Sequence, residues 1–140
     1  MTDQFSAGKR SAIMRAIRGK DTKPEHAVRS LIHRLGYRYR LHVRELPGCP
    51  DLVFPSRRKV IFVHGCFWHR HHCRKGRSTP TTRARFWKEK LESNKSRDAK
   101  HRRTLRRLGW SVLTVWECQI APKKTDRLAQ RICRFLDGSH

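Results

Sequence analysis

The sequence predicts an α/β fold in which helices flank a small mixed sheet. Two observations carry this prediction. Helical and strand-like segments alternate along the 140 residues in the order α, α, β, β, β, α, β, α. Residues 59–65 (KVIFVHG) also form a continuous apolar run, as in a strand buried on both faces. Since no repeat or linker divides the chain, we expect one domain over residues 1–140, with a core at 21–136.

Two helices are expected before the first strand. Residues 7–19 carry apolar side chains among Lys and Arg and predict a short helix. In the next helix Asp21 or Thr22 serves as the N-cap, Pro24 suits the first turn and Gly36 ends it. The buried stripe of this second helix consists of Val28, Leu31, Ile32 and Leu35.

Three strands are expected next, within residues 37–65. Residues 37–43 (YRYRLHV) alternate between apolar and basic side chains, which is typical of a half-exposed strand with His42 on its polar face. The inward side chains would be Tyr37, Tyr39, Leu41 and Val43, and Arg38 and Arg40 would face outward with His42. Residues 51–54 (DLVF) predict a second strand, and a turn leads into the buried strand at 59–65.

The second half of the chain begins with a Cys/His-rich and basic loop at 65–80. Residues 82–108 predict one helix or two, ended by Gly109. Residues 110–117 (WSVLTVWE) predict a fourth strand, and 123–136 a final helix. Its inward residues would be Leu128, Ile132 and Phe135.

The charge of the chain indicates a polyanionic partner. Lys and Arg number 34 and Asp and Glu 11, for a formal net charge of +23. Nucleic acid is the leading candidate, because neutralising phosphates releases counterions. No apolar run approaches the roughly 18 residues of a spanning helix, so no membrane association is expected. The first ten residues lack the apolar segment of a signal peptide, and we therefore expect a cytoplasmic protein.

The cysteines indicate metal ligation. Their number, five, is odd and argues against a disulfide framework. Within residues 63–73 (VHGCFWHRHHC), Cys66 and Cys73 bracket histidines, so either His71, His72 or His69 can complete three zinc ligands, and Cys118 is a natural fourth. Alternatively, the histidines are solvated surface residues and the cysteines small buried apolar side chains.

A second metal site is predicted where two strands meet. Asp51 begins one strand, and the neighbouring strand delivers Val63 and His64, so a carboxylate and further ligands can hold Mg²⁺. Alternatively, Asp51 caps its strand or pairs with a basic side chain. If Cys66, His71 and Cys73 bind zinc, His64 and His69 remain beside Asp51, where an imidazole can act as a general base.

Phe67 and Trp68 lie between the candidate zinc ligands and have two interpretations. In one interpretation they pack over the zinc, and in the other they enter a base stack as an apolar wedge that kinks the duplex. The basic residues around them favour the wedge without deciding between the two.

Six segments together carry a resemblance to one family: MRAI, DTKPE, LPGCPDLVF, VIFVHGCFWHRHHC, FWKEKLESN and LGWSVLTVWEC. Over about residues 9–136 the chain resembles the very short patch repair endonucleases. These bacterial enzymes nick DNA beside a T·G mismatch left by deamination of 5-methylcytosine. The resemblance implies a restriction-endonuclease-like fold, with a central mixed sheet flanked by helices and a structural zinc. Residues 1–20 would be a DNA-contacting segment.

The resemblance also implies residue roles. Asp51 and the main-chain carbonyl of Val63 would hold Mg²⁺, His69 would be the general base and His64 a second active-site imidazole. Glu25 would reach the region of the metal-bound water. The zinc ligands would be Cys66, His71, Cys73 and Cys118, and the intercalating side chains Met14, Phe67 and Trp68.

Two positions near Asp51 are set apart from these roles. Val63 stands where the familiar form of the family has Thr, so a main-chain role is retained and a hydroxyl role is not. Cys49 lies close to Asp51, and no role is carried over to it.

The expected function is therefore a Mg²⁺-dependent, strand-specific endonuclease. It would cut 5′ to the T of a T·G mismatch in double-stranded DNA and leave 3′-hydroxyl and 5′-phosphate ends. No dimerisation element is visible, which favours a monomer, and accessory mismatch-repair proteins are candidate partners. The alternatives are a zinc-braced nucleic-acid-binding module without catalysis, and a restriction-type enzyme that cuts both strands of matched duplex.

Overall fold

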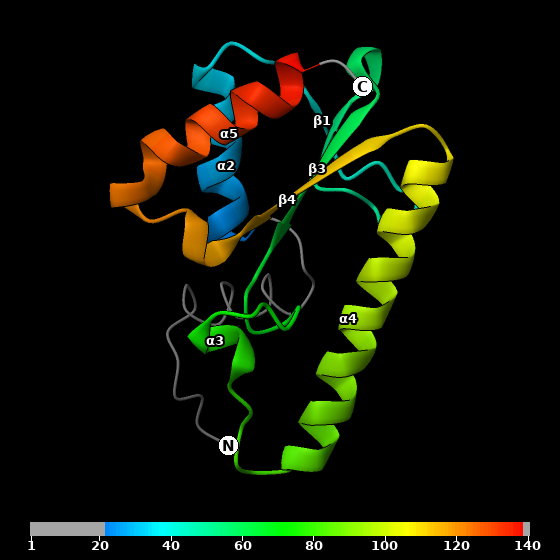
Figure 1. Cartoon of the computed structure of the whole chain (residues 1–140), viewed down its shortest axis with the longest axis vertical. Coiled ribbons are helices and arrows are strands. Elements are labelled where there is room, and N and C mark those ends of the chain that lie inside the picture. Colours follow the sequence, from blue (N-terminus) through cyan, green and yellow to red (C-terminus); the bar gives the residue numbers. More distant parts are fainter. Residues whose placement is uncertain (1–21, 139–140) are drawn as a thin grey trace, which may run out of the picture.

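A computed structural model describes residues 22–138 and shows a mixed α/β fold. Its four-stranded sheet has the order β1-β2-β3-β4 (Figure 1). The strands are β1 (Arg40–Leu41), β2 (Leu52–Phe54), β3 (Lys59–His64) and β4 (Ser111–Trp116). The first three pair antiparallel, whereas β3 and β4 are parallel. Met14, the predicted helix at 7–19 and the whole predicted DNA-contacting segment 1–20 lie outside the described residues.

Helices cover both faces of the sheet. In Figure 1, α2 (Lys23–Arg34) and α5 (Thr125–Asp137) lie on one side and α4 (Ala84–Arg107) on the other. One helical turn, α3 (Arg74–Arg77), follows the Cys/His-rich loop. Three short 3₁₀ helices complete the described elements: η1 (Pro55–Arg57), η2 (Glu117–Gln119) and η3 (Pro122–Lys124). The prediction of a mixed sheet flanked by helices is therefore confirmed.

The alternation of β2 and β3 side chains divides the core into two parts. Toward α2 and α5, the strands contribute Leu52, Phe54, Ile61, Val63 and Val115, and the helices Val28, Leu31, Ile32, Leu128, Ile132 and Leu136. Toward α4, the second part contains Val53, Val60, Phe62 and Leu105. All six residues of β3 are buried, which confirms the prediction from its apolar run.

The residues predicted to begin or end two of the helices are confirmed. The Thr22 hydroxyl accepts a hydrogen bond from the Glu25 N–H at 3.3 Å, so Thr22 is the N-cap of α2. Gly36 follows that helix with φ +96°, a left-handed conformation that glycine adopts without strain. Residues 84–107 form one helix rather than two, and Gly109 follows it with φ +94°.

The strand predicted at 37–43 is wrong in most of its length. Only Arg40 and Leu41 pair with β2, and Leu41 is 42% exposed although it was expected to point inward. The chain turns at His42, whose φ is +48°, and the alternating pattern ends there. His42 was expected on the solvent face, yet its ring lies against Glu25 and Asp51.

Lys59 joins β3 to the end of α5. It is 4% exposed, and its ammonium donates hydrogen bonds to the main-chain oxygens of Phe135, Leu136 and Gly138. A cation at this place satisfies carbonyl groups that the last turn of a helix leaves open. No described helix is both long and apolar enough to cross a membrane.

Candidate active site and metal sites

The parallel pairing of β3 and β4 places the candidate site residues at one edge of the sheet. His64, the last residue of β3, lies opposite Trp116, the last residue of β4. The loop after His64 and the 3₁₀ helix η2 therefore start side by side. This brings Cys66 and Cys118 together although they are 52 positions apart in the sequence.

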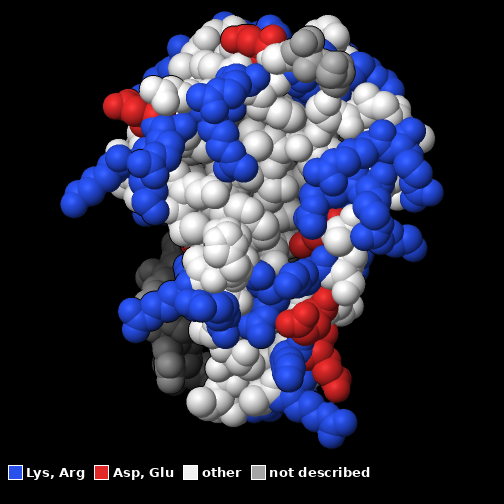
Figure 2. All heavy atoms as spheres, viewed as in Figure 1, with Lys and Arg blue, Asp and Glu red and all other residues white. Residues whose placement is uncertain are grey.

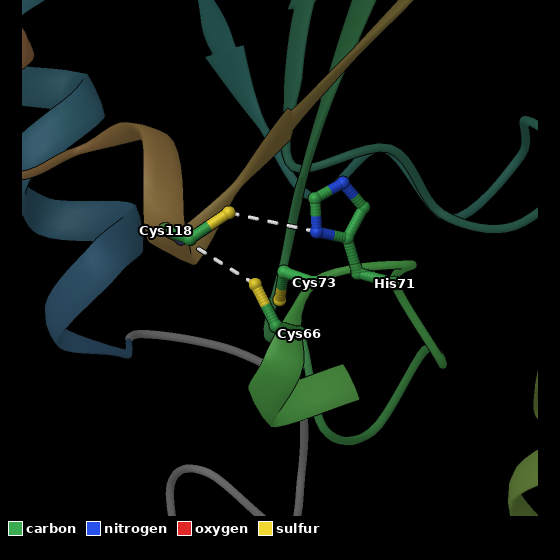
Figure 3. A group of neighbouring side chains, drawn as sticks. All are labelled: Cys66, His71, Cys73 and Cys118. Atoms are coloured by element: carbon green, nitrogen blue, oxygen red, sulfur yellow. Dashed lines mark hydrogen bonds between the residues drawn. The ribbon is translucent and has the colours of Figure 1, made fainter. Parts of the chain in front are cut away.

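The four predicted zinc ligands converge at this edge. One ligand atom from each of Cys66, His71, Cys73 and Cys118 lies within 4.8 Å of the others. Figure 3 shows the three sulfur atoms and the His71 ring turned toward a common centre. Cys118 Sγ is 3.5 Å from His71 Nδ1, and the Cys118 N–H points at Cys66 Sγ at 3.4 Å. Three thiols and one imidazole are a donor set that fits tetrahedral zinc.

The electrostatics of these four groups also favour a cation. Burial, together with the neighbouring thiols, raises the pKa of Cys66 to about 12. Burial lowers the pKa of His71, which keeps its imidazole neutral. A divalent cation would reverse the first effect, because it stabilises the thiolate that it binds.

Gly76 lets α3 close over this group. A Cβ atom built at Gly76 would lie 1.9 Å from the carbonyl oxygen of His71. No side chain can be placed there without moving either the His71 backbone or α3. Gly76 therefore fixes the distance between the part of the loop that carries His71 and the helix that begins after Cys73.

Glu25, His42 and Asp51 form a second group. One ligand atom from each lies within 4.8 Å of the others, and both carboxylates are almost fully buried, at 1% and 6% exposure. Asp51 Oδ2 accepts a hydrogen bond of 2.6 Å from the Val63 N–H. Burial and then the charge of Glu25 raise the pKa of Asp51 well above its ordinary value. A divalent cation would relieve this repulsion, so the residues present fit a hard metal ion.

His64, His69 and Asp98 form a third group. The two imidazole rings stack with centroids 3.8 Å apart and an angle of 7° between their planes. His69 Nδ1 lies 2.5 Å from Asp98 Oδ2. Burial, followed by the charges of His69 and Arg102, lowers the pKa of His64 to about 3. His64 is therefore neutral at pH 7, and His69 has one ring nitrogen held by a carboxylate.

One cavity of about 350 Å³ connects the second and third groups. Asp51, His64, His69 and Asp98 all line it. Glu25 contributes from behind, because it is buried next to Asp51 rather than at the cavity wall. An anionic group in this cavity would lie between two features. On one side is Asp51 of the candidate metal site, and on the other is the His69 imidazole, which Asp98 holds.

Phe67 and Trp68 form another wall of the same cavity and pack against α4. Their rings are 5.1 Å apart, and each lies about 6 Å from the ring of Trp87, at 6.1 and 5.8 Å. Phe86 adds a further contact to Trp87 at 5.6 Å. Phe67, Trp68 and Trp87 are only half-buried, so these rings form an aromatic group at the rim of the cavity.

The surface around the site is basic. Figure 2 shows Lys and Arg side chains over both flanks of the molecule, with few Asp or Glu. A second, more open cavity of about 810 Å³ shares His69 and Asp98 with the first. Its walls include five cationic side chains: Arg70, Arg77, Lys95, Arg102 and Arg131. Among these, the side chains of Lys95 and Arg102 make no hydrogen bond or ion pair with a described residue.

Three residues of this region were missed by sequence reasoning. Asp98 lies in the middle of a highly charged helix, 29 positions after His69, and nothing local distinguishes it. His42 was hidden by an alternating pattern that assigned it to the solvent. Trp87 follows Phe86 in the segment FWKEK, and a pair of aromatics in such a basic helix was the one available signal.

Comparison with known proteins gives a consistent result. Residues 2–75 match the family described as DNA mismatch endonuclease Vsr. A type II nicking enzyme, V.XorIIP of Xanthomonas oryzae pv. oryzae, is 48% identical over 139 residues, which are 99% of this chain and all of that protein. The DNA mismatch endonuclease Vsr of Escherichia coli K12 is 42% identical, over 95% of this chain and 89% of its own length. A nicking enzyme of Neisseria meningitidis, V.NmeAIP, is also 42% identical, over 97% and 95%.

Proposed function

The chain belongs to the Vsr family of DNA mismatch endonucleases, and we propose that it cuts one strand of duplex DNA 5′ to the T of a T·G mismatch, using Mg²⁺. It is a DNA endonuclease, a hydrolase of phosphodiester bonds. The observation that supports the finer proposal is the single cavity lined by Asp51, His64, His69 and Asp98, with Phe67 and Trp68 at its rim. We further infer a restriction-endonuclease-like fold with a structural zinc.

In this proposal Asp51 and the main-chain carbonyl of Val63 hold the catalytic ion. A bound Mg²⁺ would supply positive charge for the phosphate and for the attacking water. The 2.6 Å hydrogen bond from the Val63 N–H to Asp51 Oδ2 fixes one carboxylate oxygen and leaves Oδ1 for the cation. Glu25, buried behind Asp51, adds negative charge that favours a divalent ion at this place.

His69 is the proposed general base. Asp98 engages Nδ1, so Nε2 is the ring nitrogen that can take the proton of the attacking water. The Asp98 carboxylate also stabilises the imidazolium that forms. His64 stacks on His69 and is neutral at pH 7, so it holds the ring in place without adding a second positive charge.

The proposed zinc braces the loop that carries these residues. Cys66 and Cys73 flank Phe67, Trp68 and His69, and Cys118 ties this loop to the end of β4. Loss of zinc would therefore displace the general base and the aromatic group together. The role of zinc is positional, because its four ligands would leave no open place for substrate.

Mismatch recognition is proposed for the aromatic group. Unstacking a base step costs a few kcal/mol, and least where the pair is mismatched. Phe67 and Trp68, supported by Trp87, form a half-exposed apolar edge beside the cavity, in a surface that is otherwise basic. Insertion of this edge at a T·G step would place the neighbouring phosphate in the cavity. Met14 remains a proposed intercalating residue.

A monomer that makes one cut is the proposed active form. The rival is a restriction-type reaction on both strands of matched duplex. The two are separated with end-labelled duplexes that differ only in T·G or C·G at one position, in several sequence contexts, with Mg²⁺ or EDTA. We expect one Mg²⁺-dependent nick 5′ to the T, leaving 3′-hydroxyl and 5′-phosphate ends, in one context.

Asp51→Ala is the variant that tests the metal assignment. We expect nicking to fall by at least about 100-fold while the melting temperature and DNA binding in EDTA stay close to those of the wild type. Nicking at the wild-type rate by Asp51→Ala would refute the metal assignment. Cleavage of both strands of C·G duplex would favour the restriction-type reaction instead.

A further inference from the structure

We propose that His42 is a nitrogen ligand of the metal ion at Asp51 and makes this site bind Mn²⁺ in preference to Mg²⁺. This inference rests on the proposed function, which places a divalent ion beside Asp51. No role in this site was expected for His42 from the sequence. As a ligand, His42 would give the site a selectivity for Mn²⁺ over Mg²⁺ that two carboxylates and a carbonyl would not have.

The backbone aims the His42 ring at the carboxylates. The His42 N–H donates to the main-chain oxygen of Asp51 at 3.3 Å, which continues the β1–β2 pairing by one residue. At His42 itself φ is +48°, a left-handed conformation that is uncommon outside glycine and costs of order 1 kcal/mol. Directly opposed residues of an antiparallel pair share one face of the sheet, so His42 lies on the same side as the buried Asp51. In this conformation the imidazole lies against Glu25 and Asp51.

The ring meets both carboxylates. His42 Nδ1 is 3.9 Å from Asp51 Oδ1, and His42 Nε2 is 3.2 Å from Glu25 Oε2. The separation of 3.9 Å is too long for a hydrogen bond. Neighbouring ligands of an octahedral ion with bonds of about 2.1 Å lie about 3.0 Å apart, so binding would draw the ring and the carboxylate together by roughly 1 Å. The ligand atoms of Glu25, His42 and Asp51 already lie within 4.8 Å of one another. Asp51 Oδ1 is also the oxygen that the Val63 N–H leaves open.

The other ring nitrogen has two competing neighbours. Arg29 Nη2 lies 2.9 Å from Nε2, which requires Nε2 to accept a hydrogen bond. Glu25 Oε2 can instead accept a proton from Nε2, which requires the opposite tautomer. In the first tautomer the proton sits on Nδ1 and blocks it. In the second, Nδ1 offers a lone pair toward Asp51.

Metal binding selects the second tautomer. With the ion on Nδ1, Nε2–H donates to Glu25, which gives the carboxylate–histidine–metal arrangement that orients many histidine ligands. Arg29 keeps its separate ion pair with Glu25 at 2.5 Å, so its charge stays compensated when it gives up the contact with His42. Glu25 thus acts as a positioning residue for the ligand and need not contact the ion.

A nitrogen ligand changes which ion is favoured. Mg²⁺ prefers oxygen donors, whereas imidazole binds first-row transition metals with greater affinity. A site of Asp51, a main-chain carbonyl and His42 should therefore still accept Mg²⁺ but bind Mn²⁺ more tightly. Replacing the imidazole with an amide oxygen should remove most of that difference.

The test measures Mn²⁺ binding to the zinc-loaded full chain without DNA, by loss of the free-ion electron paramagnetic resonance signal, with Mg²⁺ as the competitor. Spin-echo modulation of the bound Mn²⁺ reports whether a nitrogen is directly attached. His42→Gln retains an oxygen donor, and His42→Asn provides a second variant that tolerates the left-handed φ. His33→Gln, an exposed histidine in the last turn of α2, is the matched control.

We expect nitrogen modulation in the wild type and in His33→Gln, and its loss in both His42 variants. Their Mn²⁺ affinity should fall about tenfold or more, whereas Mg²⁺ affinity should change less than about threefold. Unchanged modulation, or equal losses for both ions, would overturn the assignment of His42. If Asp51→Ala binds both ions like the wild type, the proposed metal centre itself fails, whatever the His42 variants do.

Discussion

His69 Nδ1 lies 2.5 Å from Asp98 Oδ2 and thereby joins the Cys/His-rich loop to the middle of α4. An amide at position 98 would keep the size of the side chain but would not stabilise a charged imidazole. We expect Asp98→Asn to lower the nicking rate about 100-fold or more, with DNA affinity in EDTA within about threefold of the wild type. Single-turnover nicking and fluorescence anisotropy measure the two quantities. Equal loss of nicking and of binding would show that Asp98 is merely structural.

The buried imidazole of His64 makes stability depend on pH. Its pKa in the folded protein is about 3, whereas an exposed histidine titrates near 6.5. The unfolded chain therefore takes up a proton that the folded chain does not, so stability is lost as the pH falls below about 6.5. This contribution amounts to about 2 kcal/mol at pH 5.

Denaturant unfolding of the wild type and of His64→Asn at pH 7 and pH 5 checks this expectation. The wild type should lose about 2 kcal/mol more than the variant between the two pH values. In parallel, the His64 ring resonances should stay those of a neutral imidazole down to pH 5. A His64 titration midpoint near 6.5 would contradict the structure.

Cys118→Ala tests whether Cys66, His71, Cys73 and Cys118 bind zinc. Removing one of four ligands should release zinc, lower the free energy of unfolding by several kcal/mol and abolish most nicking. Cys133→Ala is the control, because Cys133 lies on α5 outside the group. Zinc content by mass spectrometry, thermal melting and nicking give three readouts. A Cys118→Ala protein that keeps one zinc and its melting temperature would rule out the predicted ligand set.

Trp87 should matter for recognition although it belongs to a different element from Phe67 and Trp68. Its ring supports both of theirs, and aromatic contacts of this kind contribute about 1 kcal/mol each. We expect Trp87→Ala to weaken binding of T·G duplex about tenfold and binding of C·G duplex much less. Phe86→Ala is the control, because the Phe86 ring contacts Trp87 but neither Phe67 nor Trp68. Equal effects on both duplexes would place Trp87 outside mismatch recognition.

Lys95 and Arg102 should contact DNA phosphates, because both line the cationic cavity and neither side chain forms a hydrogen bond or an ion pair with a described residue. Each lost phosphate contact lowers the slope of log affinity against log salt by about 1. The double variant Lys95→Gln/Arg102→Gln should therefore lower it by about 2. The control Arg34→Gln/Arg38→Gln changes two exposed residues that line neither of the two cavities. Equal slopes in the two double variants would show that this cavity is not part of the DNA interface.

Local signals explain which parts of the fold and site were predictable. The Thr22 cap, Gly36 and the buried run of β3 act over a few residues, and all three were read correctly. The convergence of Cys118 with Cys66 was also expected, because both follow strand ends. That they bind zinc stays a prediction.

The missed residues depend on tertiary structure. Asp98 contacts His69 only because α4 packs across one face of the sheet. The sequence of α4 contains many charged residues, and nothing in it distinguishes Asp98 from the others. His42 lies against Glu25 at the point where the strand ends in a left-handed φ, and such a φ breaks the pattern from which strands are predicted.

The parallel pairing of β3 and β4 has a consequence for how the protein acquires its activity during folding. The antiparallel β2 and β3 are joined by a short turn and can form early, whereas β4 must wait for residues 65–110 to be arranged. Cys118, which follows β4, reaches its place beside Cys66 only in that late step. A partly folded or nascent chain would therefore carry the positive charge that attracts DNA before it has a completed centre to cut it.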